Sequence, residues 1–117
     1  MIPFISVLVA VAAYQTPHLS LNYTPIVPPV LLDIAQCESG QQQFDDDGKI
    51  IKHKNKDGSI DYGYFQINSS HIKHAKSLGF DIFTPEGNVG YALWLYNASS
   101  TIPWNSSKSC WKHSNSG

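Results

Sequence analysis

The sequence predicts a single α+β domain that is mainly helical and carries a small β-hairpin or three-stranded sheet. Its 117 residues suit one compact domain and are too few for two. An apolar fraction of 42% with 14 aromatic residues is enough for a core. Residues typical of helix starts and helix ends recur along the chain. Between the first and second predicted helices lies a segment with turn dipeptides and with β-branched and aromatic residues.

The N-terminal part divides by composition into two segments. Residues 1–13 are apolar and end in small residues, which predicts a secretory signal peptide or a membrane anchor, although no positive charge precedes the apolar run. They are too few for a membrane-spanning helix, which needs roughly 20 apolar residues. Residues 14–29 hold four of the seven prolines and predict an extended spacer. The folded domain is therefore predicted to span residues 30–113.

The first helix is predicted over residues 30–39, because two prolines precede it and Gly40 follows it. The next segment has Asp-Gly dipeptides at positions 47 and 57, followed by β-branched and aromatic residues. These patterns predict the small sheet over residues 48–67.

Two further helices are predicted after the sheet. One covers residues 70–78, with Asn68 or Ser69 as its N-cap and a glycine after its end. The other begins with Thr84 as N-cap and a proline in its first turn. Its second half, Tyr91 to Tyr96, is apolar nearly all round, which predicts a buried central helix.

Two cysteines stand near the two ends of the predicted domain. A bridge between Cys37 and Cys110 would stabilise the chain by about 4 kcal/mol and would fit an oxidising compartment. Two buried free thiols are the alternative. Neither cysteine has a second ligand at metal-site spacing. We expect the C-terminal tail to fold back onto the first helix, with Trp104 and Trp111 as core anchors.

The charge pattern argues against nucleic acid as a partner, because the net charge is −1. A lysine-rich run over residues 49–56 follows three aspartates and is interpreted as a solvated hairpin surface. The same region resembles a calcium loop only in part. His53 and Tyr64 occupy the positions that need the first carboxylate and the bidentate glutamate, so no metal site is predicted.

Glu38 is the unusual residue of the first helix. It falls on the same helical face as the apolar Leu31, Ile34 and Ala35. Such a carboxylate is either a structural ion, paired with Lys73 or Lys76, or an acid whose pKa is raised by desolvation.

Three segments, "CESG", "GYFQIN" and "GNVGYALWLYNAS", occur in the order found in a known superfamily. The chain resembles the lysozyme-like superfamily, in its lytic transglycosylase (SLT) and goose-type lysozyme branch. "AQCESG" with the terminal "PW…CW" is also similar to resuscitation-promoting factor domains. The resemblance covers residues 30–111. It implies a lysozyme-like fold and cleavage of the β-1,4 bond between N-acetylmuramic acid and N-acetylglucosamine in peptidoglycan, without a cofactor.

The resemblance also implies roles for individual residues. Glu38 is the expected catalytic acid. Tyr96 and Asn97 match a tyrosine–asparagine pair near that acid, although Tyr91 could take the tyrosine's place. Gln66 suits a sugar amide or hydroxyl, with capping of backbone groups as its alternative role. The full set of expected substrate-binding residues is Ser39, Tyr64, Gln66, Asn68, Tyr91, Tyr96 and Asn97, of which Asn68 is also the helix cap.

A second carboxylate is the remaining question of mechanism. Asp61 is better placed for it than the three aspartates at 45–47, but members of the resembled branch generally act without one. We therefore expect no essential second carboxylate.

The expected partner is the glycan strand of peptidoglycan. The expected state is a monomer that is exported (secreted, periplasmic or associated with the cell wall) and not stably inserted in a membrane. The alternative function is a glycan-binding lysozyme-like module that does not cut.

Overall fold

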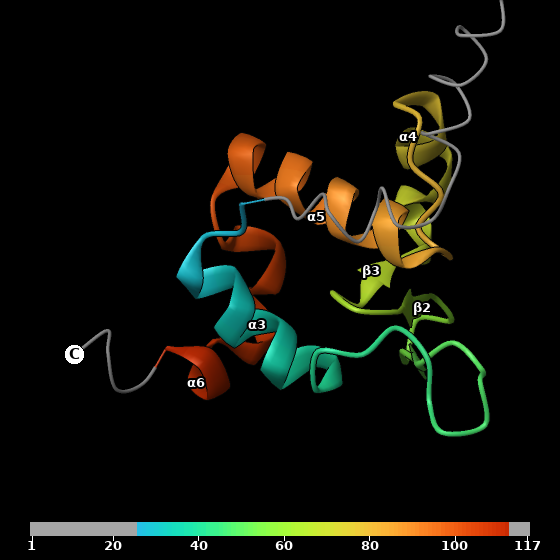
Figure 1. The fold of residues 1–117 in the computed structure, drawn as a ribbon, viewed down its shortest axis with the longest axis horizontal. Coiled ribbons are helices and arrows are strands. Elements are labelled where there is room, and N and C mark those ends of the chain that lie inside the picture. The colour runs from blue at the N-terminus through green and yellow to red at the C-terminus, as the bar shows by residue number, and fades with distance from the viewer. Residues whose placement is uncertain (1–25, 113–117) are drawn as a thin grey trace, which may run out of the picture.

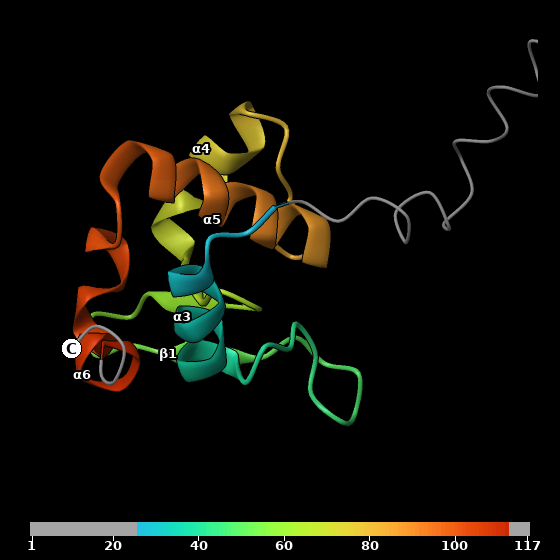
Figure 2. The same ribbon diagram turned by 60° about the vertical axis from the view of Figure 1, so that its left-hand side comes forward.

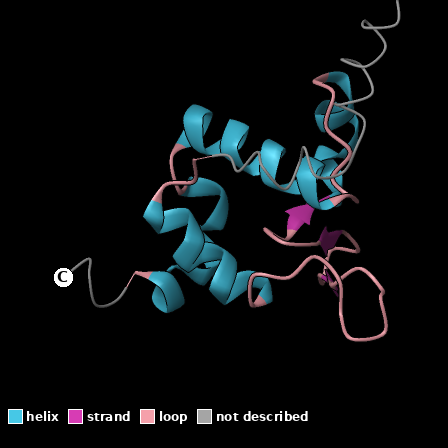
Figure 3. Ribbon diagram, in the orientation of Figure 1, coloured by secondary structure: helices cyan, strands magenta, loops and turns pink. Residues whose placement is uncertain are grey.

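The protein is described by a computed structural model over residues 26–112. The predicted signal peptide or anchor, residues 14–25 of the predicted spacer and residue 113 lie outside this range. Figures 1 and 3 show a small sheet with a long loop at the lower right, and helices to the left of the sheet and above it. The predicted α+β class with mainly helical content is confirmed. Among residues 26–112, no helix is both long and apolar enough to cross a membrane.

Helix α3 spans Pro29–Ser39 and confirms the first predicted helix. Pro29 supplies a φ angle suited to the first turn, and Gly40 ends the helix in the left-handed conformation at φ 72°. The helix buries Leu31, Ile34 and Ala35 against the core.

The sheet has three antiparallel strands in the order β1-β2-β3. They are β1 (Lys52–Lys54), β2 (Ile60–Tyr62) and β3 (Ile67–Asn68). The β-prone run at 60–67 is therefore split into two strands. Gly63 and Gln66 have positive φ angles of 77° and 51°, and the Gln66 N–H donates to the Gly63 carbonyl at 3.0 Å, which reverses the chain.

Two buried amides hold this reversal in place. Gln43 Oε1 accepts from the Tyr64 N–H at 2.7 Å, and Asn88 Oδ1 accepts from the Phe65 N–H at 2.8 Å. Asn88 Nδ2 also donates to the Tyr62 carbonyl at 2.8 Å. The backbone groups between β2 and β3 thus find their partners on a loop and on a helix, which satisfies groups that burial would otherwise penalise.

The helices after the sheet begin where their caps predict. Asn68 Oδ1 accepts from the Ser70 N–H at 3.0 Å and starts a 3₁₀ turn, η1 (Ser69–His71), which continues into α4 (Ile72–Ser77). Thr84 Oγ1 accepts from the Gly87 N–H at 3.0 Å at the start of α5 (Pro85–Ser99).

The prediction that α5 is buried all round is wrong. Tyr91, Ala92 and Leu95 are buried, but Trp94, one turn after Tyr91 and stacked on its ring, is 38% exposed. Figures 1 and 2 show why, because α5 crosses one side of the molecule and the other elements cover only part of its circumference.

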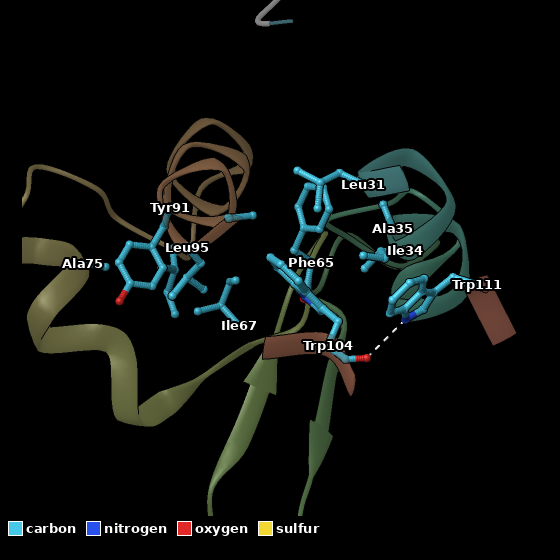
Figure 4. Close-up of a cluster of buried hydrophobic side chains, with 12 residues drawn as sticks. Leu31, Ile34, Ala35, Phe65, Ile67, Ala75, Tyr91, Leu95, Trp104 and Trp111 are labelled. Carbon is cyan, nitrogen blue, oxygen red and sulfur yellow. Dashed lines mark hydrogen bonds between the residues drawn. The ribbon is translucent and has the colours of Figure 1, made fainter. Parts of the chain in front are cut away.

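The chain then folds back through η2 (Ile102–Ser107) and α6 (Lys108–Trp111). Trp104 and Trp111 are buried, as predicted, and the Trp111 Nε1–H donates to the Trp104 carbonyl at 3.2 Å. Figure 4 shows Phe65, Ile67 and Trp104 between α5 on one side and α3 with Trp111 on the other. The predicted Cys37–Cys110 disulfide is present and joins α3 to α6 across 73 positions of the sequence.

Candidate active site

Glu38 lies in the last turn of α3, half-buried at the edge of a pocket of about 290 Å³. The pocket lies among the end of α3, the sheet, η1 and the segment around η2. Its lining combines apolar side chains with amides, hydroxyls and carboxyls. The lining residues are Glu38, Asn55, Asp57, Ser59, Asp61, Gln66, Ile67, Asn68, His71, Leu95, Pro103, Trp104 and Ser106.

Burial raises the pKa of the Glu38 carboxyl above its usual value. The hydrogen bond from Ser107 acts against this rise in pKa, the Asp61 carboxylate adds to it, and His53 opposes it more weakly. No lysine of the described chain is among the groups that shift the pKa of this carboxyl. The interpretation of Glu38 as an ion paired with Lys73 or Lys76 therefore finds no support in residues 26–112.

Ser107 is the direct partner of the acid. Its Oγ–H donates to Glu38 Oε2 at 2.5 Å, and the same Oγ accepts from Trp111 Nε1–H at 3.1 Å. The Trp104 carbonyl, 3.2 Å from Oγ, is a second acceptor for the serine proton. When Glu38 is protonated, the serine proton can turn to that carbonyl, and Oγ can accept from the acid. Ser107 thus has a hydrogen-bonding arrangement for each protonation state.

The disulfide holds Glu38 and Ser107 together. Cys37 is the neighbour of Glu38 in α3, and Cys110 follows Ser107 by three residues. A covalent link beside both ends of a hydrogen bond limits how far the acid and its partner can separate.

One face of the sheet forms the opposite wall. His53 pairs with Asp61, and Asp61 pairs with Asn68, so the three residues form a row across the strands. Asn68 Nδ2 donates to Asp61 Oδ1 at 2.8 Å and to Ser59 Oγ at 3.0 Å. Asn68 therefore caps a helix, as predicted, and also lines the pocket.

Gln66 caps backbone groups, as its alternative role predicted, and it also lines the pocket. Its Nε2 donates to the carbonyls of Ile51 at 3.2 Å and Gly63 at 3.0 Å, so the side chain does cap backbone groups. It lines the pocket as well, and its Oε1 remains as an acceptor for a ligand.

The other predicted substrate-binding residues do not line the pocket. Ser39 is a structural link, because its Oγ donates to the Tyr64 carbonyl at 2.7 Å. Tyr91, which was predicted to contact substrate, is fully buried and is absent from the pocket lining. On α5 the pocket is reached by Leu95, and since successive helical residues point about 100° apart, Tyr96 and Asn97 turn away from it.

Residues 26–112 also bring in groups that were not predicted for the site. His71 lines the pocket from η1, and Ser107 bonds the acid. The sequence carried a signal for the serine, because a Cys37–Cys110 bridge brings the residues before Cys110 close to Glu38. Nothing comparable in the sequence pointed to His71. Within the described range, no three His, Cys, Asp or Glu side chains lie close enough together to hold a metal ion.

Comparison of the chain with protein-family models, with curated proteins and with solved structures finds no match.

Proposed function

We propose that this protein is an exported muramidase or lytic transglycosylase of the lysozyme-like fold. It cleaves the β-1,4 bond between N-acetylmuramic acid and N-acetylglucosamine of peptidoglycan. The observation that carries the proposal is a glutamate with a raised pKa at the edge of a polar pocket.

Cleavage of a glycosidic bond needs a proton on the leaving oxygen. A carboxyl group that desolvation keeps protonated at higher pH is suited to deliver it. Glu38 has that environment, and Ser107 can bond it before and after the proton leaves. The resemblance to lytic transglycosylases adds the second step. The acetamide oxygen of the muramic acid stabilises the anomeric carbon, and the Glu38 carboxylate then acts as base toward the sugar's own 6-hydroxyl or toward water.

The lining of the pocket fits a sugar that carries acetamide and hydroxyl groups. Gln66 offers a carbonyl oxygen, and Asn55 and Ser106 add amide and hydroxyl groups. Leu95 and Trp104 supply apolar surface in the same lining. The disulfide supports export, because such bridges persist in oxidising compartments.

The experiment that tests the function is a digest of purified peptidoglycan followed by mass analysis of the soluble muropeptides. The wild-type chain is expected to release them, with either anhydro or hydrolysed ends, which differ in mass by one water. Glu38→Gln is expected to lower the rate by about 10²- to 10⁴-fold, the usual contribution of a general acid.

The control for this variant is Glu86→Gln, which changes an exposed glutamate in the first turn of α5 and should keep the activity. Circular dichroism checks the fold of both variants. Binding of the glycan without release by the wild type would contradict cleavage and favour the glycan-binding module.

The same variant has a predicted effect on stability. Because folding raises the pKa of Glu38, the folded chain binds more protons than the unfolded chain between the two pKa values. The contribution of this residue to stability therefore falls as the pH rises through that interval. Glu38→Gln should gain stability relative to wild type between pH 4.5, the usual value, and neutrality, as measured by urea unfolding.

A further inference from the structure

Two histidines share one buried tyrosine hydroxyl behind the pocket. Tyr91 Oη lies 2.9 Å from His71 Nδ1 and 2.9 Å from His74 Nδ1. The three side chains come from α5, η1 and α4, and Tyr91 is fully buried. Figure 4 shows the tyrosine hydroxyl directed away from Phe65 and Trp104 at the centre of the core.

The tautomers of the two imidazoles are coupled because the tyrosine hydroxyl between them has a single proton. The hydroxyl has one proton, so it can donate to only one of the two Nδ1 atoms. The other Nδ1 must then carry a proton and donate to Oη. When both rings are neutral, one histidine is therefore the Nδ1–H tautomer and the other is the Nε2–H tautomer. A change of tautomer in one ring requires the opposite change in the other.

The two ends of the cluster face different surroundings. His71 lines the pocket, where Glu38, Asp57 and Asp61 are the other titratable groups. His74 is exposed on α4, and the edge of Trp94 packs against it with ring centroids 4.8 Å apart. Because both Nδ1 atoms bond the tyrosine, Nε2 is the ring nitrogen of His71 left for a ligand.

We propose that His71, Tyr91 and His74 form a proton relay from the surface to the pocket, in which His71 hydrogen-bonds the bound glycan. The proposal rests on the proposed function for the identity of the ligand. In the relay, the Nδ1–H of protonated His74 passes its proton to Tyr91 Oη while the tyrosine proton passes to Nδ1 of neutral His71, so His74 is left neutral with its proton on Nε2 and His71 becomes protonated. One proton leaves His74 and one arrives on His71, and the tyrosine stays neutral.

The relay gives His71 a pH-dependent role. A protonated His74 must donate from Nδ1 to Tyr91 Oη, so the hydroxyl donates to His71 Nδ1. Neutral His71 then carries its own proton on Nε2, as a donor toward the ligand. Protonating both rings would leave the buried hydroxyl proton without an acceptor, so the pair takes up its second proton much less readily than its first. Burial and the charge of His74 lower the pKa of His71, in the direction this coupling requires.

The test is ¹⁵N NMR of the histidine side chains in the full chain across pH. His71 and His74 should show opposite neutral tautomers, and the two rings should titrate as a coupled pair. In His74→Ala, an exposed change that leaves the core packing intact, His71 should become the Nε2–H tautomer and titrate in a single step at higher pH. Tyr91→Phe should abolish the coupling while both rings remain.

Binding of the N-acetylglucosamine trimer tests the pocket end of the relay. The trimer should shift the His71 nitrogen resonances, and His71→Ala should weaken its binding by about two- to tenfold, the loss expected for one hydrogen bond. Independent titration of His71 and His74 in the wild type, or an unshifted His71 with the trimer bound, would overturn the proposal. Coupled titration with the trimer bound through His71, but no release of muropeptides, would leave the relay standing and reject the proposed cleavage.

Discussion

The helical and sheet walls of the pocket are built in different ways. The helical wall carries Glu38 on α3 and Ser107 at the end of η2, and a disulfide joins these parts of the chain. The sheet wall presents Asp61 and Asn68, which bond each other, on strands held by hydrogen bonds from buried amides.

In the proposed function, this difference between the walls separates proton transfer by Glu38 from binding of the sugar. Glu38 is desolvated and has one hydroxyl partner that can adapt to either protonation state, so its proton can be lost and regained. The side chains of the sheet wall are mostly engaged in hydrogen bonds within the protein, so the proposed binding of a sugar would cost them little conformational entropy. Substitutions in the two walls should therefore differ in their effects on stability and on the pH profile of cleavage.

Removal of the disulfide should have the largest effect on stability. Cys37→Ser with Cys110→Ser is expected to lower the free energy of unfolding by about 4 kcal/mol, because the unfolded chain loses a loop constraint of this size. Urea unfolding measures this, with the oxidised wild type as reference. A loss below about 1 kcal/mol would show that packing of α6 alone holds the helical wall.

The matching change on the sheet wall is Gly63→Ala. Its φ of 77° disfavours any Cβ, and an added Cβ would lie 2.5 Å from both Asn88 Nδ2 and Gln43 Oε1. The backbone strain and the displaced amides together should cost about 3 kcal/mol.

Gly58→Ala is the control for that change, because its φ is 91° but nothing lies within 4 Å of the added Cβ. It should cost only about 1 kcal/mol. Equal losses for the two variants, measured by thermal or urea unfolding, would mean that the buried amides contribute little to the turn.

Ser107→Ala should cost about 1 kcal/mol of stability and should change the pH profile of cleavage. The serine hydrogen bond lowers the pKa of Glu38, so its removal raises that pKa further. Since the protonated acid is the active form in the proposed mechanism, the alkaline limb of kcat/KM should move to higher pH. Ser106→Ala, an exposed neighbour that also lines the pocket, should leave the limb in place.

Asp61→Asn should produce the smallest effect of these variants, and it should shift the pH profile of cleavage in the direction opposite to Ser107→Ala. The Asp61 charge raises the pKa of Glu38, so the alkaline limb should move to lower pH while most of the activity remains. The double variant Asp47→Asn/Asp61→Asn should behave in the same way, because Asp47 lies outside the pocket. A loss comparable to that of Glu38→Gln, with the fold intact, would identify Asp61 as an essential second carboxylate.

The parts of the fold that were predicted correctly depend on local chemistry. Proline and glycine bound α3, and Asn68 and Thr84 cap their helices through neighbours two or three residues away. The split of the 60–67 run was missed, because the groups that stabilise its turn include Gln43 and Asn88, both more than 20 positions from their partners.

The candidate site, like the fold, was predicted where local sequence was sufficient and missed where packing decided. Glu38, Gln66 and Asn68 were expected and all line the pocket, since the first stands in a recognisable helix end and the others at a strand end. Tyr91 was placed in the site as a possible replacement for Tyr96 in the resembled tyrosine–asparagine pair, and its burial depends on how α5 rotates about its axis against the core.

The sequence by itself determined where the helices start and stop, that a β-rich segment interrupts them, and that an acid stands on the apolar face of α3. These features follow from backbone preferences and side-chain periodicity over a few residues. Only the tertiary structure decided what faces that acid, because Ser107 is 69 positions from Glu38 and reaches it through chain reversal and core packing. The coupling of His71 to His74 through Tyr91 likewise depends on the packing of η1, α4 and α5 against one another.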